Sequence, residues 1–289
     1  TIVIIHNLNS RGKNINEDYV RELLNKKGIK FHYFQTKQIS DVDEIIKKYN
    51  NPSEYQYCSI GGDGSLNALV NSLMKNNITM PEVSCLPGGS GSDFIRTFAL
   101  PQNIEQAVEH LNYDNFYEVD VGLIKNKTDA KYFINVLNIG FLASTVEVSE
   151  KFPNLFRAFR YPLSFWIKII TARAKEMTIS NDKYEFKGMA FNICVCNAQY
   201  FGGGWNISPK SSLQDGLFNI QVFAVTKLKA MQIFFLAKKG LHLKESSVKL
   251  KRLSQLTVNS RDPIEIDGDF FGYGPADIFI KKRAIRFKI

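Results

Sequence analysis

The sequence predicts an α/β N-terminal domain with a doubly wound parallel sheet, followed by a larger β-rich antiparallel C-terminal domain. Residues 1–112 alternate apolar, β-branched runs with segments of helical periodicity, which is the order of a parallel α/β sheet. From residue 113 onward, strand-like runs follow one another with turn residues between them. The length of 289 residues, at about 150 per domain, also suggests two domains. We place the boundary between residues 122 and 123, and leave open a return of the last strand, about residues 277–289, to the first domain.

The elements of the first domain follow from periodicity and from capping residues. Residues 2–7 are apolar and β-branched, whereas residues 15–27 have helical spacing and stop at Gly28, a typical residue after a helix end. Ser40 can cap a helix whose first turn contains Asp41 and Asp43, where the helix dipole favours acids. We therefore expect strands at residues 2–7, 31–36, 55–60 and 83–86, and helices at residues 15–27, 40–49 and 65–74.

The second domain reads as a series of strands with two helical interruptions. The helices are expected at residues 161–175 and 227–239. The first of them lies in a stretch, residues 151–175, that contains six basic residues, six aromatic residues and no acid. Its apolar residues Leu163, Trp166, Ile167 and Ile170 follow helical spacing and could pack on the core or lie on an anionic membrane. Strands are expected at residues 117–124, 132–138, 189–197, 217–224, 248–258 and 263–266.

Composition and charge exclude several classes of protein. With 44% hydrophobic residues and no apolar run near the roughly 20 residues of a membrane span, neither disorder nor a transmembrane helix is expected. The chain opens directly on a strand without a signal-peptide pattern, so we expect a cytoplasmic location. The four histidines show no metal-binding spacing. Residues 126–289 hold 25 basic against 13 acidic residues, and this excess suggests an anionic surface as a partner.

Two glycine-rich segments follow neighbouring strands of the predicted parallel sheet. The first, residues 61–65 (Gly-Gly-Asp-Gly-Ser), opens a helix, where main-chain N–H groups and the helix dipole favour phosphate. The second, residues 87–93 (Pro-Gly-Gly-Ser-Gly-Ser-Asp), repeats the arrangement. An acid in such a loop, as at Asp63, suits a metal ion or proton transfer, although a turn that needs positive φ is the structural alternative. Neither segment fits a Walker A loop, a Rossmann fingerprint or a nucleophile elbow.

At these residues the chain resembles the diacylglycerol kinase catalytic family, the bacterial lipid kinases related to sphingosine and ceramide kinases. The family's G-G-D-G-T corresponds to residues 61–65, and its P-x-G-T-x-N-D to residues 87–93. Its N-P-x-x-G-x-K opening is similar to residues 7–13, its N-x-x-x-x-G-F-x-A to residues 135–143, and its D-G-E to residues 267–269. A glycine-rich stretch that ends in D-G corresponds to residues 197–216. The motifs occur in the family's order over nearly the whole chain.

The resemblance implies an ATP-dependent kinase that phosphorylates a lipid hydroxyl, with ATP on residues 1–122 and the lipid on residues 123–276. It implies Mg²⁺ as the second cofactor, because phosphoryl transfer depends on charge neutralisation and positioning. The implied catalytic residues are Asp63, Asp93 and Asp269, with the identity of the general base left open. The implied nucleotide-binding residues are Asn7, Asn9, Lys13, Gly61, Gly62, Gly64, Ser65, Gly89, Ser90 and Gly91. The implied metal-binding residues are Asp63, Asp120, Asp215 and Asp269, although Asp120 and Asp215 could equally be structural acids.

Departures from the family pattern bear on the acceptor. Leu142 replaces the acid of the family's G-F-D-A, and Ser144 stands where sphingosine kinases have the aspartate associated with the substrate amine. A cationic amine in a desolvated pocket needs a carboxylate partner, so we expect diacylglycerol as the acceptor and phosphatidic acid as the product. Asp269 replaces the family glutamate and Ser92 an asparagine. The alternatives are a kinase of a sphingoid base, ceramide or glycolipid, and a catalytically weak nucleotide-binding module at the membrane.

The expected partners are diacylglycerol or a related lipid and an anionic membrane surface, on which the protein would be peripheral. A homodimer is a further option. No nucleic acid is expected, because the sequence contains no recognised RNA- or DNA-binding module.

Overall fold

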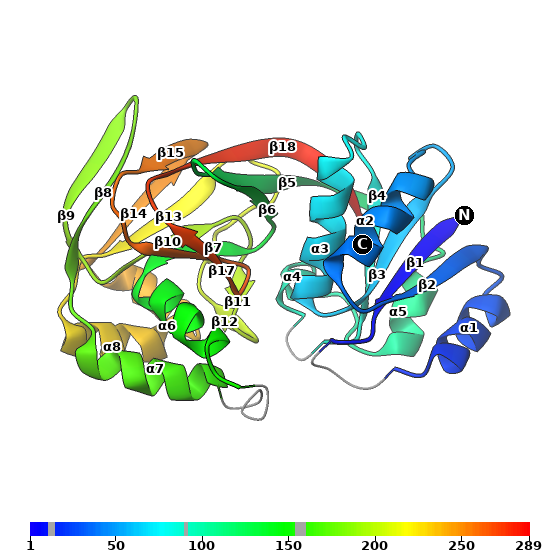
Figure 1. Ribbon diagram of the computed structural model, residues 1–289, viewed down its shortest axis with the longest axis horizontal. Helices are drawn as coiled ribbons and strands as arrows, with labels where there is room; N and C mark the ends of the chain where they lie inside the picture. Colours follow the sequence, from blue (N-terminus) through cyan, green and yellow to red (C-terminus); the bar gives the residue numbers. More distant parts are fainter. Residues whose placement is uncertain (11–14, 90–91, 154–159) are drawn as a thin grey trace.

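Four parallel strands near the N-terminus form one end of a ten-stranded sheet in the computed structural model, which describes residues 1–10, 15–89, 92–153 and 160–289. Their order is β2-β1-β3-β4, and every pair among them is parallel (Figure 1). The parallel N-terminal sheet predicted from the sequence is confirmed. The strands are β1 (Ile2–Asn7), β2 (Phe31–Thr36), β3 (Gln56–Gly61) and β4 (Glu82–Pro87).

Helices cover both faces of these strands, because successive side chains of a buried strand point to opposite faces. On β1, Ile4 packs in the cluster that contains Leu24 of the first helix, whereas its neighbour Ile5 packs in the cluster that contains Leu69 of the third. The five helices of this region are α1 (Glu17–Lys26), α2 (Ile39–Lys48), α3 (Asp63–Lys75), α4 (Asp93–Thr97) and α5 (Ile104–His110).

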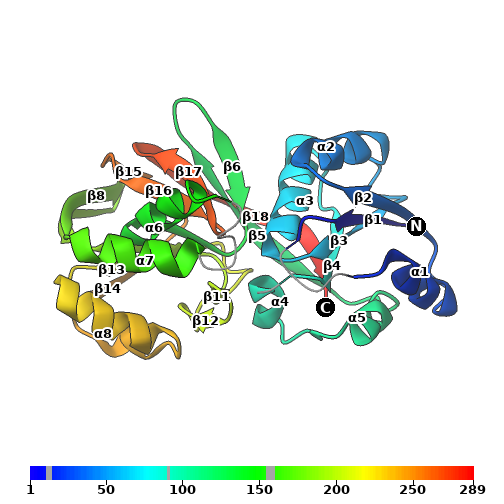
Figure 2. The same ribbon diagram turned by 60° about the horizontal axis from the view of Figure 1, so that its bottom comes forward.

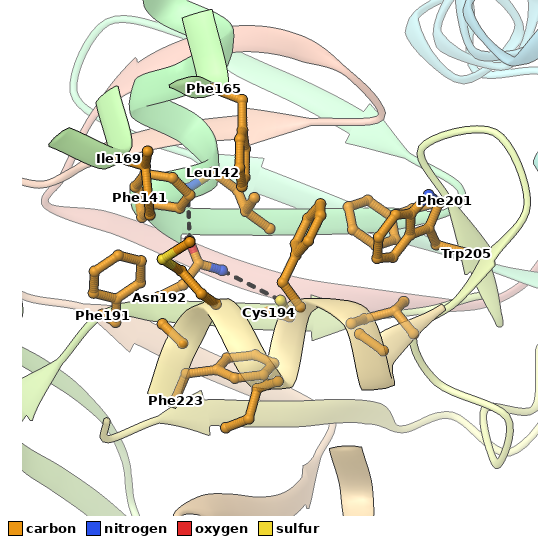
Figure 3. Close-up of a pocket in the computed structure, with 16 residues that line it drawn as sticks. Phe141, Leu142, Phe165, Ile169, Phe191, Asn192, Cys194, Phe201, Trp205 and Phe223 are labelled. Atoms are coloured by element: carbon orange, nitrogen blue, oxygen red, sulfur yellow. Dashed lines mark hydrogen bonds between the residues drawn. The ribbon is translucent and has the colours of Figure 1, made fainter. Parts of the chain in front are cut away.

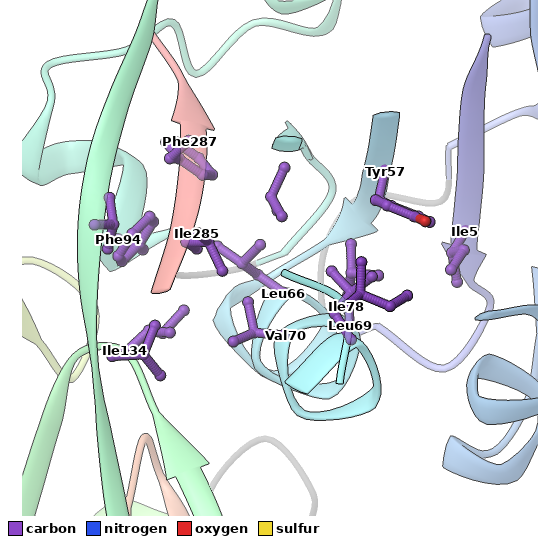
Figure 4. Close-up of a cluster of buried hydrophobic side chains, with 14 of the residues drawn as sticks. Ile5, Tyr57, Leu66, Leu69, Val70, Ile78, Phe94, Ile134, Ile285 and Phe287 are labelled. Atoms are coloured by element: carbon purple, nitrogen blue, oxygen red, sulfur yellow. The ribbon is translucent and has the colours of Figure 1, made fainter. Parts of the chain in front are cut away.

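The same sheet continues through strands from the second half of the chain. Strand β18 (Ala276–Lys288) pairs in parallel with β4 and in antiparallel fashion with β5 (Phe116–Lys125). Ile285 and Phe287 of β18 belong to the same buried cluster as Leu66 and Phe94 (Figure 4). The remaining strands of this sheet are β6 (Ala130–Phe133), β8 (Lys175–Asn181), β9 (Tyr184–Ala190) and β15 (Gln255–Val258).

A second sheet of six antiparallel strands packs against the far part of the first. Phe133 of the first sheet stacks on Phe218 of the second with ring centroids 5.5 Å apart, within an apolar cluster that both sheets share. The predicted β-rich antiparallel domain is therefore confirmed. The strands, in sheet order, are β14 (Val248–Leu253), β13 (Phe218–Phe223), β10 (Asn192–Cys196), β7 (Val136–Gly140), β16 (Pro263–Ile266) and β17 (Asp269–Tyr273).

Three helices lie on the outer side of this second sheet (Figures 1 and 2). They are α6 (Phe141–Glu150), α7 (Arg160–Thr171) and α8 (Lys227–Ala237), and a 3₁₀ turn (Leu241–Lys244) follows α8. A short hairpin of β11 (Tyr200–Phe201) and β12 (Trp205–Asn206) lies beside α4 and links this region to the N-terminal domain. Among the described residues, no helix is both long enough and apolar enough to cross a membrane.

Three runs that the sequence predicts as single long strands are each divided between the two sheets. Residues 132–138 become the end of β6 and most of β7, residues 189–197 become the end of β9 and β10, and residues 248–258 become β14 and β15. Each run passes from one sheet to the other. Each run keeps strand-forming residues on both sides of the break, and both sheets contribute to one apolar cluster, so strand propensity alone does not mark the break.

Candidate active site at the junction of the two sheets

The two glycine-rich segments pack directly against each other at the carboxyl ends of β3 and β4. The Gly88 N–H donates a 2.9 Å hydrogen bond to the Gly61 carbonyl. A Cβ on Gly89 would lie 2.2 Å from the Cα of Gly62, which no side chain tolerates. Glycine at these positions is therefore required by the contact between the loops, whatever else the loops bind. Ser90 and Gly91 lie outside the described residues.

The end of β1 adds two asparagines to this edge of the sheet. The side-chain amide of Asn7 donates to Ser65 Oγ at 3.0 Å, and its Oδ1 accepts from the Asn9 N–H at 2.9 Å. Asn9 in turn donates to the Lys37 carbonyl at 2.8 Å. Gly64, in the first turn of α3, has no heavy atom within 4 Å of the position a Cβ would take. The structure thus brings Asn7, Asn9, Gly61, Gly62, Gly64, Ser65 and Gly89 to one edge, while Lys13 lies outside the described residues.

Asp63 connects the first glycine segment to the helix that follows the second. Its carboxylate accepts 2.8 Å hydrogen bonds from the main-chain N–H groups of Asp93 and Phe94, at the start of α4. The Asn135 side-chain nitrogen is 3.5 Å from the same carboxylate. The Oδ1 atom of Asn135 is buried and has no hydrogen-bond partner among the described residues. An acid and an unpartnered amide oxygen therefore lie together beside the glycine loops.

Asp93 reaches across from α4 to the β11–β12 hairpin. Its buried carboxylate accepts hydrogen bonds from the N–H groups of Gly203, at 2.8 Å, and Gly204, at 2.6 Å. Burial raises the pKa of Asp93, and these two hydrogen bonds oppose the rise. Asp93 therefore fixes the position of the hairpin relative to the glycine loops.

The turn between β16 and β17 contains an aspartate that sequence reasoning overlooked. Asp267 is partly buried, and its carboxylate accepts four hydrogen bonds of 2.7–3.0 Å. The donors are the N–H groups of Ile134, Asn135 and Val136 and the side-chain amide of Asn67. Burial raises the pKa of Asp267 to about 6, and the four donors limit the rise. Asp267 is the first residue of the segment that resembles the family's D-G-E, whereas the resemblance implied a role only for the last, Asp269.

Asp269, at the start of β17, has a different environment. Its side chain is 59% exposed, and its ion-pair partner is Lys131, with Nζ 3.2 Å from the carboxylate. It lies two residues from Asp267, in the turn that Asn67 joins to α3. The structure thus places Asp269 at the junction of the two domains, with a carboxylate open to solvent.

Asp120 and Asp215 form a separate group beside β5 and β18. Asp120 is fully buried, and it accepts 2.7 Å hydrogen bonds from the N–H groups of Gly216 and Arg283. Burial also raises the pKa of Asp120. Asp215 accepts from the guanidinium of Arg252 and from the Leu217 N–H. Within the described part of the chain, no three His, Cys, Asp or Glu side chains cluster as a metal site would require, so the four implied metal ligands remain predictions.

An apolar cavity lies between the second sheet and helices α6, α7 and α8 (Figure 3). Phe201 and Trp205 of the β11–β12 hairpin form part of its wall, on either side of the glycines that bind Asp93. Asn192 is a polar residue of the lining, but its oxygen accepts from the Leu142 N–H at 3.0 Å. No acid lines the cavity among the described residues, and Leu142 is part of the lining. Sequence reasoning missed this cavity because its residues come from seven separate elements and from the loops between them.

Comparison with known proteins assigns the chain to a family. The sequence model of the diacylglycerol kinase catalytic domain matches residues 1–124, and that of the YegS C-terminal NAD kinase beta sandwich-like domain matches residues 135–288. The chain belongs to the diacylglycerol kinase catalytic family. This membership confirms the resemblance seen in the sequence, and supports a lipid kinase that uses ATP.

Diacylglycerol kinases of staphylococci align over most of this chain. A diacylglycerol kinase of Staphylococcus haemolyticus is 28% identical over 232 residues, which are 78% of this chain and 68% of the relative. One from Staphylococcus aureus is 26% identical over 93% of this chain and 87% of its own length. The solved structure of a diacylglycerol kinase from Bacillus anthracis has a TM-score of 0.73 at 19% identity, covering 100% of this chain and 96% of that one. The likeness to the solved structure supports the fold, and the likeness to the staphylococcal relatives supports a lipid kinase.

Proposed function

We propose that this protein transfers the γ-phosphoryl group of ATP to the hydroxyl of diacylglycerol, giving phosphatidic acid. The observation that carries the proposal is the path from Asp63 to the cavity. Asp63 binds the N–H of Asp93, the Asp93 carboxylate binds Gly203 and Gly204, and the hairpin containing these glycines lines the apolar cavity. In our proposal, Asp63, Asp93 and the β11–β12 hairpin therefore connect the site for the phosphates to the site for the acyl chains.

The residues at the edge of the parallel sheet are suited to a triphosphate. Gly64 leaves open space at the first turn of α3, where N–H groups that lack an intrahelical partner point outward. Asn7, Asn9 and Ser65 supply neutral polar atoms beside it. In our proposal these groups hold the nucleotide, and they position its terminal phosphate toward the β16–β17 turn.

The acids at the junction suit the remaining requirements of phosphoryl transfer. Asp63 and the unpartnered Oδ1 of Asn135 are hard oxygen ligands, the type that Mg²⁺ prefers, and we propose that they would hold the ion together with the phosphates. Bound Mg²⁺ would neutralise charge on the transferred group. Each carboxylate oxygen of Asp267 already accepts two hydrogen bonds, so it has no lone pair left for a substrate proton. We therefore propose that Asp267 holds the β16–β17 turn in position. The exposed Asp269 is then the residue that would accept the hydroxyl proton.

The cavity favours a neutral acceptor. A sphingoid amine would need an anionic partner where water is excluded, and the lining of the cavity supplies none among the described residues. Ser144 donates its hydroxyl to the Phe141 carbonyl at 2.7 Å, so its hydrogen is already used. Diacylglycerol offers a neutral hydroxyl and apolar chains, which match this environment.

The test is transfer of radiolabelled phosphate from ATP, with Mg²⁺, to pure lipids in mixed micelles. Diacylglycerol, ceramide, sphingosine and a glycolipid are compared, and the products are separated by chromatography. We expect labelled phosphatidic acid, and we expect Asp63→Asn to lower its formation by about 100-fold or more, since an electrostatic contact to the reacting group is removed. Labelling of another lipid alone would overturn the choice of acceptor. ATP binding with no labelled lipid would favour the regulatory alternative.

A further inference from the structure

The outer surface of α7 exposes the apolar stripe that the sequence left without an assignment. Leu163, Trp166, Ile167 and Ile170 are 40%, 57%, 43% and 74% exposed. The buried residues of this helix are Ser164 and Ile169, which lie on the opposite side. Packing on the core therefore does not explain the stripe.

Helix α8 extends this surface. It runs beside α7 in both views of the molecule (Figures 1 and 2), and Lys227 at its start donates a 2.6 Å hydrogen bond to the Ile170 carbonyl of α7. Leu228 and Phe235 of α8 are 81% and 69% exposed. We call the six exposed residues of the two helices the outer apolar face: Leu163, Trp166, Ile167, Ile170, Leu228 and Phe235.

The charges carried by the two helices of this face are all positive. Neither α7 nor α8 contains an aspartate or glutamate, whereas Arg160, Lys168, Lys227 and Lys229 lie within the two helices. Two acids lie close to these helices, and both are paired: Glu245 with Lys229 at 2.6 Å, and Glu147 of α6 with Lys151 at 2.8 Å. Lys238 and Lys239 follow α8 and are exposed. An apolar face rimmed by cations is complementary to an anionic lipid surface. It is not complementary to a second copy of itself, because the two rims would repel.

We propose that the outer apolar face docks on an anionic lipid bilayer, with α7 and α8 lying in the plane of the interface. The proposal extends the function proposed above by naming the surface on which the kinase meets its lipid. The helices that carry this face also form one wall of the apolar cavity, through Phe165 and Ile169 of α7 and Phe234 of α8. Docking there places the cavity wall against the bilayer that contains the substrate.

Co-sedimentation with vesicles tests the docking without ATP or diacylglycerol, so the result is independent of kinase activity. Vesicles of phosphatidylcholine with phosphatidylglycerol are compared with phosphatidylcholine alone. We expect the wild type to bind the anionic vesicles, and expect Ile170→Ser, Leu228→Ser and Phe235→Ser together to reduce binding at least tenfold. The matched control substitutes three apolar residues of similar exposure elsewhere, Ile39, Met189 and Leu250, with serine. Equal binding by the first triple variant and the wild type would overturn the proposal.

Charge reversal provides a second, independent measurement. Lys238→Glu with Lys239→Glu should weaken binding to anionic vesicles by about tenfold or more, because each lysine near such a surface contributes about 1 kcal/mol. Lys47→Glu with Lys48→Glu, the exposed pair at the end of α2, is the control and should bind as the wild type does. If the Lys47→Glu, Lys48→Glu variant loses vesicle binding to the same degree, the net charge of the protein, and not this face, drives association, and the proposal is overturned.

Trp166 reports insertion directly. The chain has two tryptophans, so Trp205→Phe leaves Trp166 as the only tryptophan, whose emission is excited selectively over that of the tyrosines. Lipids brominated along the acyl chain should quench its fluorescence in the presence of anionic vesicles. Unquenched emission, or a concentration-dependent dimer by light scattering that the triple serine variant abolishes, would overturn the proposal in favour of a protein contact.

Discussion

The side-chain amide of Asn67, on α3, donates a 2.7 Å hydrogen bond to the carboxylate of Asp267, in the β16–β17 turn. The helix that begins at the first glycine segment is thereby joined to the turn that contains the proposed proton acceptor. Asn71, one turn further along α3, donates to the Tyr132 carbonyl at 2.9 Å and strengthens the same junction. Positions that are 200 residues apart in the sequence therefore form one rigid contact.

Substitutions in this turn should separate structure from chemistry. In Asp267→Asn an NH₂ group replaces one carboxylate oxygen, so two N–H donors of the side chain face the N–H donors that the oxygen had accepted. We expect the free energy of unfolding to fall by about 2–4 kcal/mol. Asp269→Asn removes only an exposed ion pair, worth about 0–1 kcal/mol, but should lower kcat. Urea unfolding and kinase assays measure the two effects. Full kcat in Asp269→Asn would remove Asp269 from the proposed mechanism.

Two glycine variants should distinguish the packing of the loops from nucleotide binding. Gly89→Ala places a Cβ 2.2 Å from the Gly62 main chain, and we expect a loss of about 1–3 kcal/mol in stability. Gly64→Ala meets open space, so stability should be kept or rise slightly, whereas ATP should bind more weakly because the methyl group occupies the approach of the phosphates. Thermal unfolding and calorimetric ATP titration are the measurements. Unchanged ATP affinity in Gly64→Ala would place the phosphates elsewhere.

Asp93→Asn should act mainly on the lipid. An asparagine keeps one acceptor oxygen, but it cannot accept from both Gly203 and Gly204 with the same geometry, so the hairpin that lines the cavity loosens. We expect the KM for diacylglycerol to rise about threefold or more with little change in the KM for ATP, from the loss of about one hydrogen bond to a charged group. The contrary result, a larger KM for ATP alone, would assign Asp93 to the nucleotide.

Glu265 should make stability depend on pH. It is buried in β16 and accepts from the Asn138 side chain and, at 2.9 Å, from the Gly268 N–H. Burial raises the pKa of Glu265 to about 8, above the usual value of 4.5. Between those values the folded protein holds a proton that the unfolded chain has released, so stability falls as pH rises from about 4.5 to about 8.

Glu265→Gln is the corresponding test. A glutamine cannot ionise, so the free energy of unfolding of the variant should vary less with pH than that of the wild type. Between pH 5 and pH 8 the wild type should lose about 1–3 kcal/mol of stability relative to the variant. Urea unfolding at several pH values measures it. Parallel pH profiles of the two proteins would show that Glu265 is ionised throughout.

Local patterns in the sequence were sufficient for the four parallel strands and for α1, α2 and α3, because each of these strands lies in one sheet. The expected list of helices lacked α4 and α5, and the expected cap at Ser40 was wrong, since α2 begins after Gln38. Local patterns were insufficient where the chain changes sheets. Residues 132–138 read as one strand, but the carboxylate of Asp267 takes the N–H groups of Ile134, Asn135 and Val136 and so breaks the pairing at that point. A partner that lies 130 or so residues away in the sequence leaves no local signal.

The same limit applies to the candidate site. Glycine loops and acids form contiguous motifs, so residues 61–65 and 87–93 could be selected from the sequence. The partners of those acids, such as the Gly203 and Gly204 N–H groups that Asp93 binds, lie about 110 residues away, and nothing local in the sequence pairs them with Asp93. The cavity and the exposure of the α7 stripe depend on how three helices pack on a sheet, and periodicity alone does not determine which side faces outward.

The last strand has a consequence for synthesis of the chain. Because β18 supplies the neighbour of β4 and adds Ile285 and Phe287 to the core beneath α3, the N-terminal half cannot complete its sheet until β18 has left the ribosome. Until then the edge of β4 and the apolar residues around Phe94 remain uncovered. The parallel strands and the antiparallel strands of the first sheet therefore come together only late in synthesis, and the two proposed sites on either side of the junction form at the same stage.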